Sequence, residues 1–205
     1  MAGSRTAALT AIGLGALSVL VLAFTVPHGG PSAADLLDSN VRALVGALAP
    51  LLAILNTLGQ LPYWAALVLV EAAWAFRRRR ELAVELVIVS AAAEAISSVV
   101  RLVVDRPRPQ LAQATDLLIS AGFPSGHVAR AVVFAATTLV VVPWLQHHRG
   151  SWLLAAVALV ALMAVARVSA SAHYSSDVLG GALLGAAIVG GWSLLTRLRR
   201  SEAAG

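Results

Sequence analysis

The sequence predicts an all-α integral membrane protein, a bundle of about six transmembrane helices with an additional interfacial helical segment. The first observation is composition: 59% of the residues are hydrophobic and 12% are charged, a balance far outside that of soluble domains. The second is that long apolar runs alternate with short polar turns. The third is length, because 205 residues hold about six spans of ~20 residues with short connections. Residues 1–205 are therefore expected to form a single membrane domain.

The apolar runs that we expect to span the membrane cover residues 7–26, 61–76, 82–104, 128–145, 152–170 and 178–196. The first follows Arg5 and could be a signal peptide. It is longer than the usual apolar region of one, however, and no clear small-x-small cleavage pattern follows, so we interpret it as a retained span. The second is short and needs its flanking residues to cross the bilayer. The last is expected to pack closely through small residues: Gly181, Gly185, Gly190 and Gly191.

Residues 32–58 form either a seventh span or an interfacial helix. Their apolar residues recur at helical spacing, and Pro50 is expected to bend the helix. Polar residues interrupt the pattern: Asp35, Asp38, Arg42 and Asn56. The distribution of arginines decides between the two. With six spans, one side of the membrane receives Arg5, Arg77–Arg80, Arg149, Arg197, Arg199 and Arg200. A seventh span would separate Arg5 from the rest, so the interfacial interpretation is favoured, and the positive-inside rule makes both termini cytoplasmic.

Four other arginines do not follow the positive-inside rule, because they lie at or near the opposite face: Arg101, Arg106, Arg108 and Arg167. The loop 105–125 and the segment 168–176 face the same, extracytoplasmic side in this topology. Cations held there need an anionic partner. Nucleic acid is not expected, because the chain has no solvated basic face with interleaved aromatic residues. The absence of cysteine excludes thiol nucleophiles, disulfides and cysteine-based zinc sites.

Two polar blocks on this face suit an anion. Residues 101–109, RLVVDRPRP, carry three arginines, although alone they fit a solvated loop equally well. Residues 123–127, FPSGH, make a turn in which Ser125 is expected to cap the next helix and Gly126 lets an anion approach the backbone. Unpaired amides at a helix N-terminus favour a phosphate, which would lie beside His127. The alternative is an ordinary capped helix start with a surface histidine.

The third block, residues 166–177, contains His173 and Asp177 four positions apart. On one helical turn they would share a face, so that the carboxylate orients the imidazole. Such a pair is often only a structural hydrogen bond, but ionisable groups at the mouth of a span are functional by default. The chain crosses the membrane twice between the second and third blocks, so all three return to one side. Together they form a pocket suited to phosphoryl transfer.

These blocks resemble the type 2 phosphatidic acid phosphatases (PAP2 superfamily), whose site is related to that of vanadium haloperoxidases. The family pattern is Lys-x6-Arg-Pro, then Pro-Ser-Gly-His, then Ser-Arg-x5-His-x3-Asp. The matching residues are Arg101 with Arg108 and Pro109, then Pro124–His127, then Arg167, His173 and Asp177. The lysine position is Arg101, which keeps the charge on a planar fork. The serine position is Ala166, so one hydroxyl is missing.

The resemblance implies that His173 attacks phosphorus and forms a phosphohistidine, while Asp177 orients it. His127 would protonate the leaving oxygen and later activate water. The phosphate would be held by Arg101, Arg108, Arg167, Ser125 and the Gly126 amide. Neither a metal ion nor another cofactor is expected, because arginines supply the positive charge. Arg106 either supports the loop or reaches a second phosphate, and the sequence leaves both open.

The expected activity is hydrolysis of a phosphate or diphosphate of a membrane lipid on the extracytoplasmic face. A polyprenyl diphosphate such as undecaprenyl diphosphate is favoured by analogy, with phosphatidate or phosphatidylglycerophosphate as alternatives. A lipid-phosphate transporter or non-catalytic binding protein is the alternative of another class, but it would need the arginines and not two histidines. A haloperoxidase would need bound vanadate, and lipid access to the site argues against it. The sequence gives no oligomeric state.

Two carboxylates, Glu71 and Glu94, lie inside expected spans. An unpaired carboxylate is costly there, and such residues can mark a proton path. We expect each instead to pair with a neighbouring helix, with Arg130 as a candidate partner.

Overall fold

The protein is an all-α bundle in a computed structural model that describes residues 38–109 and 121–202, together with isolated positions before residue 38 (9, 10, 13, 16, 17, 19, 23 and 35). Within these residues every regular element is helical. The helices are α2 (Asp38–Leu44), the 3-10 helix η2 (Gly46–Leu48), α3 (Ala49–Leu58), α4 (Leu61–Phe76), α5 (Arg80–Val104), α6 (Gly126–Val141), α7 (Pro143–His147), α8 (Arg149–Ser169) and α9 (Ser175–Glu202).

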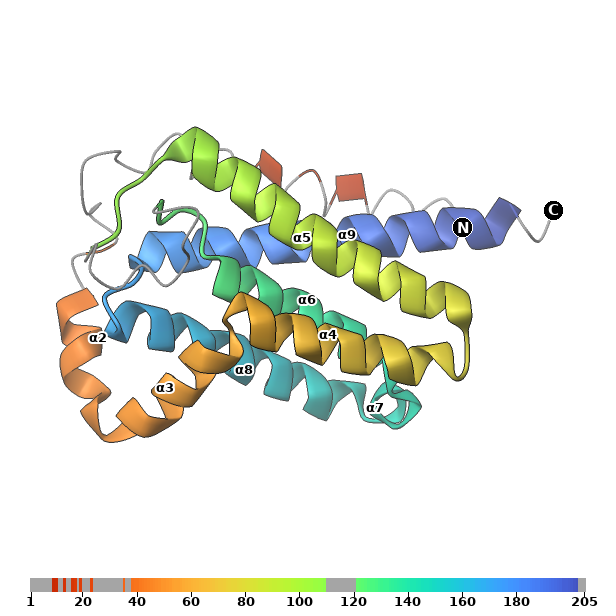
Figure 1. The fold of residues 1–205 in the computed structure, drawn as a ribbon, viewed down its shortest axis with the longest axis horizontal. Helices are drawn as coiled ribbons and strands as arrows, with labels where there is room; N and C mark the ends of the chain where they lie inside the picture. The colour runs from red at the N-terminus through yellow and green to blue at the C-terminus, as the bar shows by residue number, and fades with distance from the viewer. Residues whose placement is uncertain are drawn as a thin grey trace.

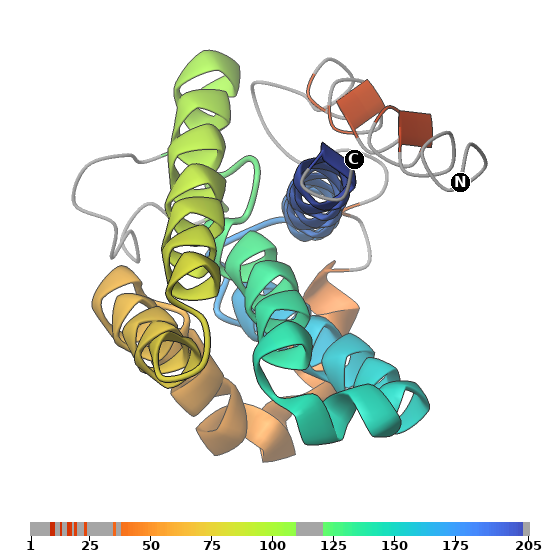
Figure 2. The same cartoon turned by 90° about the vertical axis from the view of Figure 1, so that its right-hand side faces the viewer.

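Helix α6 lies at the centre of the bundle. It packs against α4, α5, α8 and α9, and the view along the bundle shows these helices around it (Figure 2). The described parts of the loop after α5, residues 105–109 and 121–125, and the turn 169–175 lie at the end where α6 begins (Figure 1). The α4–α5 connection and α7 lie at the opposite end (Figure 1). The topology therefore brings the three polar blocks to one end, as the sequence predicts.

Small residues let α9 approach the first turns of α6. A Cβ added at Gly181 would lie 2.3 Å from the Ser125 carbonyl oxygen, and one at Gly185 would lie 2.9 Å from that of Ala129. The expected packing role is confirmed for these two glycines. At Gly191 an added Cβ would meet none of the described residues within 4 Å, so close packing at that position stays a prediction.

The described helices are apolar enough for a membrane protein. Helices α5, α8 and α9 are each long and apolar enough to cross a bilayer, and the bent pair α3–α4 passes the same test jointly. The expected span 128–145 is corrected, because α6 ends at Val141 and Pro143 begins the separate helix α7. Proline lacks the amide that would continue α6, but it suits a first helical position. The expected span 7–26 lies almost wholly outside the described residues, so the count of six spans stays a prediction.

The described part of the expected interfacial segment 32–58 folds as α2, η2 and α3. Pro50 lies in the first turn of α3 and begins that helix instead of bending it. Helices α2 and α3 pack against α8, and Leu52 and Leu55 join a buried apolar cluster with Val128 and Ala166. A bend of 70° separates α3 from α4. The segment therefore crosses over the end of α8, where α6 also begins (Figure 1).

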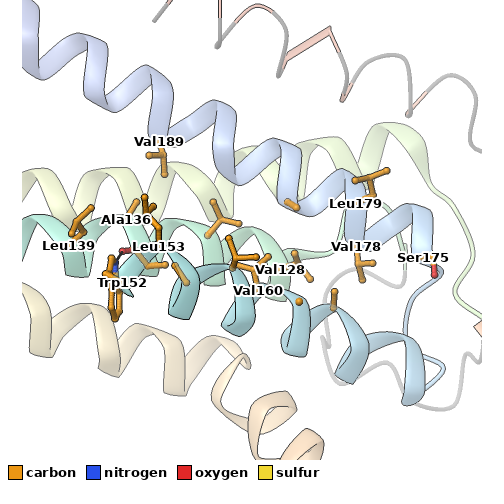
Figure 3. A pocket seen from close by; sticks show the side chains of 17 residues that line it. Val128, Ala136, Leu139, Trp152, Leu153, Val160, Ser175, Val178, Leu179 and Val189 are labelled. Carbon is orange, nitrogen blue, oxygen red and sulfur yellow. Dashed lines mark hydrogen bonds between the residues drawn. The ribbon is translucent and has the colours of Figure 1, made fainter. Parts of the chain in front are cut away.

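Many large apolar side chains of the described helices are exposed, as contact with lipid requires, among them Leu69, Val70, Leu102, Val103, Leu154 and Val157. A groove of about 670 Å³ runs between α6, α8 and α9, and its lining is almost entirely hydrocarbon (Figure 3).

Glu71 is buried in α4 and accepts hydrogen bonds from Thr137 (2.7 Å) and Thr138 of α6. This carboxylate thus pairs with a neighbouring helix, through hydroxyl groups and not through Arg130.

Candidate active site

The residues that the sequence singles out lie together at one end of the bundle, and all of them are buried: Arg101, Arg108, Ser125, Gly126, His127, Arg167, His173 and Asp177. Arg101 lies near the end of α5, and Arg167 lies in the last turn of α8. Every residue from 121 to 130 is also buried. The structure therefore brings the three polar blocks into one enclosed site.

His173 lies next to Asp177, with 3.6 Å between Nδ1 and the carboxylate Oδ2. Helix α9 begins only at Ser175, so the expected arrangement on one helical face is wrong, and His173 belongs to the turn before the helix. The same Oδ2 accepts a hydrogen bond from the Tyr174 amide at 2.9 Å. Asp177 thus anchors the backbone of the turn as well as facing the imidazole.

Arg106 is bound by two carboxylates. Its Nη1 donates to Asp177 Oδ1 at 2.6 Å and to Ser176 Oγ at 2.7 Å, and its Nη2 donates to Asp35 Oδ2 at 2.9 Å. Its guanidinium also lies 4.3 Å from the centre of the Tyr174 ring. The side chain is 0% exposed. Of the two roles left open by the sequence, these contacts favour support of the loop and of Asp177.

Sequence reasoning missed Asp35 and Asp38 as parts of the site. Asp35 accepts the Ser176 amide at 2.9 Å, and Asp38 accepts the Ser175 amide at 3.2 Å and the Ser175 hydroxyl. Carboxylates at a helix N-terminus satisfy free amides and complement the dipole. These residues therefore fix the start of α9, where Asp177 lies. The available signal is the presence of two acids in an otherwise apolar segment, which by itself indicates only an interruption of the apolar pattern.

The FPSGH turn does not cap α6 in the expected way. Ser125 occupies the N-cap position, but its hydroxyl makes no capping hydrogen bond. Its amide instead donates to the Asp177 carbonyl at 2.9 Å, which ties α6 to α9. The buried Ser125 Oγ finds no partner among the described residues. A buried hydroxyl in that state suits a ligand oxygen.

Glu94 organises the arginines on the other side of the turn. Its Oε1 accepts from Arg101 Nη2 at 3.0 Å, and its Oε2 accepts from Arg130 Nε at 2.8 Å. The expected pairing of an intramembrane carboxylate with Arg130 is thus confirmed for Glu94. A Cβ on Gly126 would lie 2.5 Å from Arg101 Nη1, so glycine is what lets this guanidinium reach the start of α6.

Helix α3 contacts the site through Asn56. Its Oδ1 accepts from Arg167 Nη1 at 3.2 Å, and its carbonyl oxygen lies 3.3 Å from His127 Nε2. The Ala166 side chain, at the family's serine position, packs in the apolar cluster with Leu52. Alanine therefore suits its surroundings here. Among the described residues, no three histidine, aspartate or glutamate side chains group as metal ligands.

An apolar helical bundle with two histidines, a carboxylate and several arginines enclosed at one end has the composition of a membrane-bound phosphatase. The chain belongs to the PAP2 superfamily, whose family model matches residues 82–201, and it is a phosphatase of that type. The match contains all three polar blocks. It begins after α4, so Asp35, Asp38 and Asn56 lie outside it.

The fold is also similar to a solved structure, that of a transmembrane PAP2 type phosphatidylglycerolphosphate phosphatase from Bacillus subtilis. The two chains are 22% identical with a TM-score of 0.74, over 91% of this chain and 96% of the other. This likeness extends beyond the family match to most of the helical bundle. No curated protein sequence matches the chain.

Proposed function

We propose that the protein removes a phosphate group from a membrane lipid through a phosphohistidine on His173. The observation that carries this proposal is the burial of both histidines, Asp177 and the phosphate-binding arginines in one site. A protein that only binds lipid phosphate needs the arginines. Two buried histidines beside them, one of them paired with a carboxylate, suit a nucleophile and a general acid.

In the proposed reaction, Nε2 of His173 attacks phosphorus, since Nδ1 faces Asp177. The bond between phosphorus and the lipid oxygen breaks as the new P–N bond forms, and His127 gives that oxygen its proton. His127 then takes a proton from water, whose oxygen attacks phosphorus and releases inorganic phosphate. This step restores the His173 imidazole and reprotonates His127.

The phosphate would be held by Arg101, Arg108 and Arg167, with the Ser125 hydroxyl and the Gly126 amide. Guanidinium groups match the phosphoryl oxygens in geometry and charge, and they stabilise the charge that develops in the transition state. The hydroxyl of Ser125 is buried without a partner among the described residues, which supports this assignment.

Among lipid substrates, a terminal phosphate monoester is favoured over a diphosphate. Arg106 is the candidate cation for the second phosphate of a diphosphate, but it is bound to Asp35 and Asp177. Phosphatidylglycerophosphate carries a terminal monoester, separate from its phosphodiester, and it is our first candidate because the similar Bacillus subtilis structure carries that lipid in its name. Phosphatidate also carries its phosphate as a monoester. A polyprenyl diphosphate such as undecaprenyl diphosphate is the second candidate.

A hydrocarbon tail would suit the groove between α6, α8 and α9. Its lining begins at Val128 and Val178, each directly after a site residue in the chain, and continues to Leu139 and Trp152 (Figure 3). From Val128 to Leu139 the groove follows eleven helical steps, or about 16 Å at 1.5 Å per residue. That length is close to one leaflet of a bilayer core ~30 Å thick. The groove supports a lipid over a soluble phosphate ester.

The site is proposed to face the extracytoplasmic side, with both termini cytoplasmic. The arginines at the opposite end of the bundle, Arg77–Arg80 and Arg149, are exposed and follow the positive-inside rule. Since the chain has no cysteine, a single cysteine at Gly150 can report the side. Labelling of intact cells by an impermeant maleimide would contradict this orientation, and labelling only after lysis would support it.

The activity is tested by phosphate release from the purified protein in detergent. We expect phosphatidylglycerophosphate to be hydrolysed faster than polyprenyl diphosphate, with and without EDTA, and we expect His173→Ala to abolish release. Radiolabelled substrate should leave an acid-labile, base-stable phosphoprotein in the wild type alone. Equal release by the variant, or none from any lipid, would refute the catalytic proposal and leave a phosphate-binding membrane protein.

A further inference from the structure

The last turn of α3 connects two separate parts of the site through Asn56. Oδ1 accepts from Arg167 Nη1 at 3.2 Å, and Nδ2 donates to the Ala166 carbonyl at 3.2 Å. The backbone carbonyl of Asn56 lies 3.3 Å from His127 Nε2. One half-buried residue therefore contacts both α8 and the first turn of α6. It lies outside the residues that match the family model.

The side-chain contacts restrict the guanidinium of Arg167. The amide of Asn56 binds the side chain of Arg167 and the carbonyl of the preceding residue, Ala166. Two bonds to one turn of α8 fix the position of the acceptor relative to the arginine. Because the amide is neutral, it orients the guanidinium without adding a negative charge beside it. A carboxylate there would offset that charge.

The backbone contact restricts His127. The Gly59 amide bonds to Leu55 and the Gln60 amide to Thr57, which leaves the Asn56 carbonyl to face the imidazole. Carbonyls at a helix C-terminus lack intrahelical partners, so this one can accept the Nε2 hydrogen and fix the orientation of the ring. Glycine at position 59 lets α3 approach the imidazole this closely, because a Cβ there would lie 2.3 Å from His127 Cδ2.

From these contacts we infer that Asn56 is a positioning residue of the active site. Its amide holds the Arg167 guanidinium for the phosphate, and its carbonyl holds the His127 ring for proton transfer to the leaving oxygen. The inference rests on the proposed function and adds α3 to the machinery. The competing explanation is structural: Asn56 only fastens α3 to α8, alongside the buried Leu52 and Leu55.

The decisive comparison is between Asn56→Asp and Asn56→Ala. Aspartate keeps the size of the side chain and an acceptor for Arg167, but it adds a negative charge beside the proposed phosphate. Alanine removes the contact without adding charge. A structural role predicts that alanine is at least as harmful as aspartate. A role in positioning a cation for phosphate predicts that aspartate is the worse of the two for anion binding.

The matched control is Thr57→Ala. Thr57 is exposed on the same helical turn, and its hydroxyl donates only to the Ala53 carbonyl within α3, at 3.0 Å. Orthovanadate binding is measured by calorimetry, together with kcat, KM and the unfolding temperature in detergent. Asn56→Asp is expected to weaken orthovanadate binding by about ten-fold or more, because it places a negative charge beside the bound anion. Asn56→Ala should weaken it less and lower kcat, and Thr57→Ala should match the wild type.

The inference is overturned if both variants bind orthovanadate like the wild type, if alanine weakens binding as much as aspartate, or if only the unfolding temperature changes. Binding is measured without turnover, which separates the two proposals. A wild type that releases no phosphate, but binds orthovanadate in the expected order of variants, refutes the catalytic proposal and supports the role of Asn56. A wild type that does not bind orthovanadate refutes the inference.

Discussion

The two ends of the bundle use arginine in opposite ways. At the end formed by the α4–α5 connection and the start of α8, Arg77–Arg80 and Arg149 are exposed (Figure 1). At the other end, Arg101, Arg106, Arg108 and Arg167 are at most 4% exposed. An exposed guanidinium keeps its water, whereas a buried one loses hydration worth several kcal/mol and needs acceptors nearby. The acids and amides around the buried arginines are therefore part of the site.

The buried end itself contains arginines of two kinds. Arg106 meets Asp35 and Asp177, so its charge is already matched by protein carboxylates. Arg167 donates to the neutral amide of Asn56, which adds no negative charge beside the guanidinium. In the proposed function, Arg106 therefore stabilises the fold of the site, whereas Arg167 binds the anionic ligand.

The largest effect is expected at Arg106. Arg106→Met would leave the buried carboxylates of Asp35 and Asp177 without their cation, and breaking a buried pair in this way costs about 3–5 kcal/mol. We expect failure to accumulate as folded protein, or a much lower unfolding temperature in detergent. The exposed control Arg149→Gln should stay within about 0.5 kcal/mol of the wild type. An Arg106 variant as stable as this control would contradict the assignment of Arg106 to the fold.

A smaller effect on stability and a large one on catalysis is expected at Arg167. Arg167→Gln removes a cation from the proposed phosphate site, and loss of one such stabilising group costs about 10²–10³ in kcat. Steady-state kinetics on a lipid phosphate give the loss, and thermal unfolding gives the stability of the same sample. If Arg167→Gln were inactive only because it unfolds, the distinction between the two kinds of arginine would fail.

The chemical blocks of the site could be predicted from the sequence because they are local. The spacing of His173 and Asp177 and the FPSGH turn can be read directly. The cost of an unpaired intramembrane carboxylate was enough to pair Glu94 with a neighbouring helix. The residues from 35 to 56 could not be assigned, because Asn56 meets Arg167 across 111 positions of sequence. Helical periodicity places such a residue on a helix but says nothing about which distant turn it meets.

Two errors were local and have simple causes. Ser125 was expected to cap α6, but its hydroxyl makes no capping bond, and its amide bonds to the Asp177 carbonyl. The run 128–145 is predicted as one span because most of its residues are apolar. Pro143 divides it into α6 and α7, because proline cannot donate the backbone hydrogen bond that would continue the helix. The hydropathy of the run does not reveal this loss.

An intermediate effect is expected at Glu94, with Glu71 as its matched control. Both are carboxylates of membrane helices, but Glu94 binds Arg101 and Arg130, whereas Glu71 binds Thr137 and Thr138. Glu94→Gln should lower kcat/KM by about ten-fold, the worth of one hydrogen bond to a charged group. Glu71→Gln should leave kcat/KM unchanged.

Arg101→Lys, which restores the residue type of the family pattern, tests whether Glu94 affects kcat/KM through Arg101. A lysine cannot use one nitrogen for Glu94 while directing another at Gly126. Glu94→Gln should therefore cost less in the Arg101→Lys background than in the wild type. Equal losses in both backgrounds would show that Glu94 does not act through the Arg101 fork.

The smallest effects separate the two ends of α9. At the site end, a Cβ on Gly185 would lie 2.8 Å from Val132 Cβ and 2.9 Å from the Ala129 carbonyl. Gly185→Ala must therefore push α9 away from α6, and we expect a lower unfolding temperature and lower activity. Farther along the helix, a Cβ on Gly191 would meet none of the described residues within 4 Å, so Gly191→Ala should stabilise the helix by about 0.5–1 kcal/mol through propensity alone. A lower unfolding temperature for Gly185→Ala and a higher one for Gly191→Ala would mean that close packing of α9 is confined to the part that positions Asp177. Destabilisation by both would extend that packing along the whole helix.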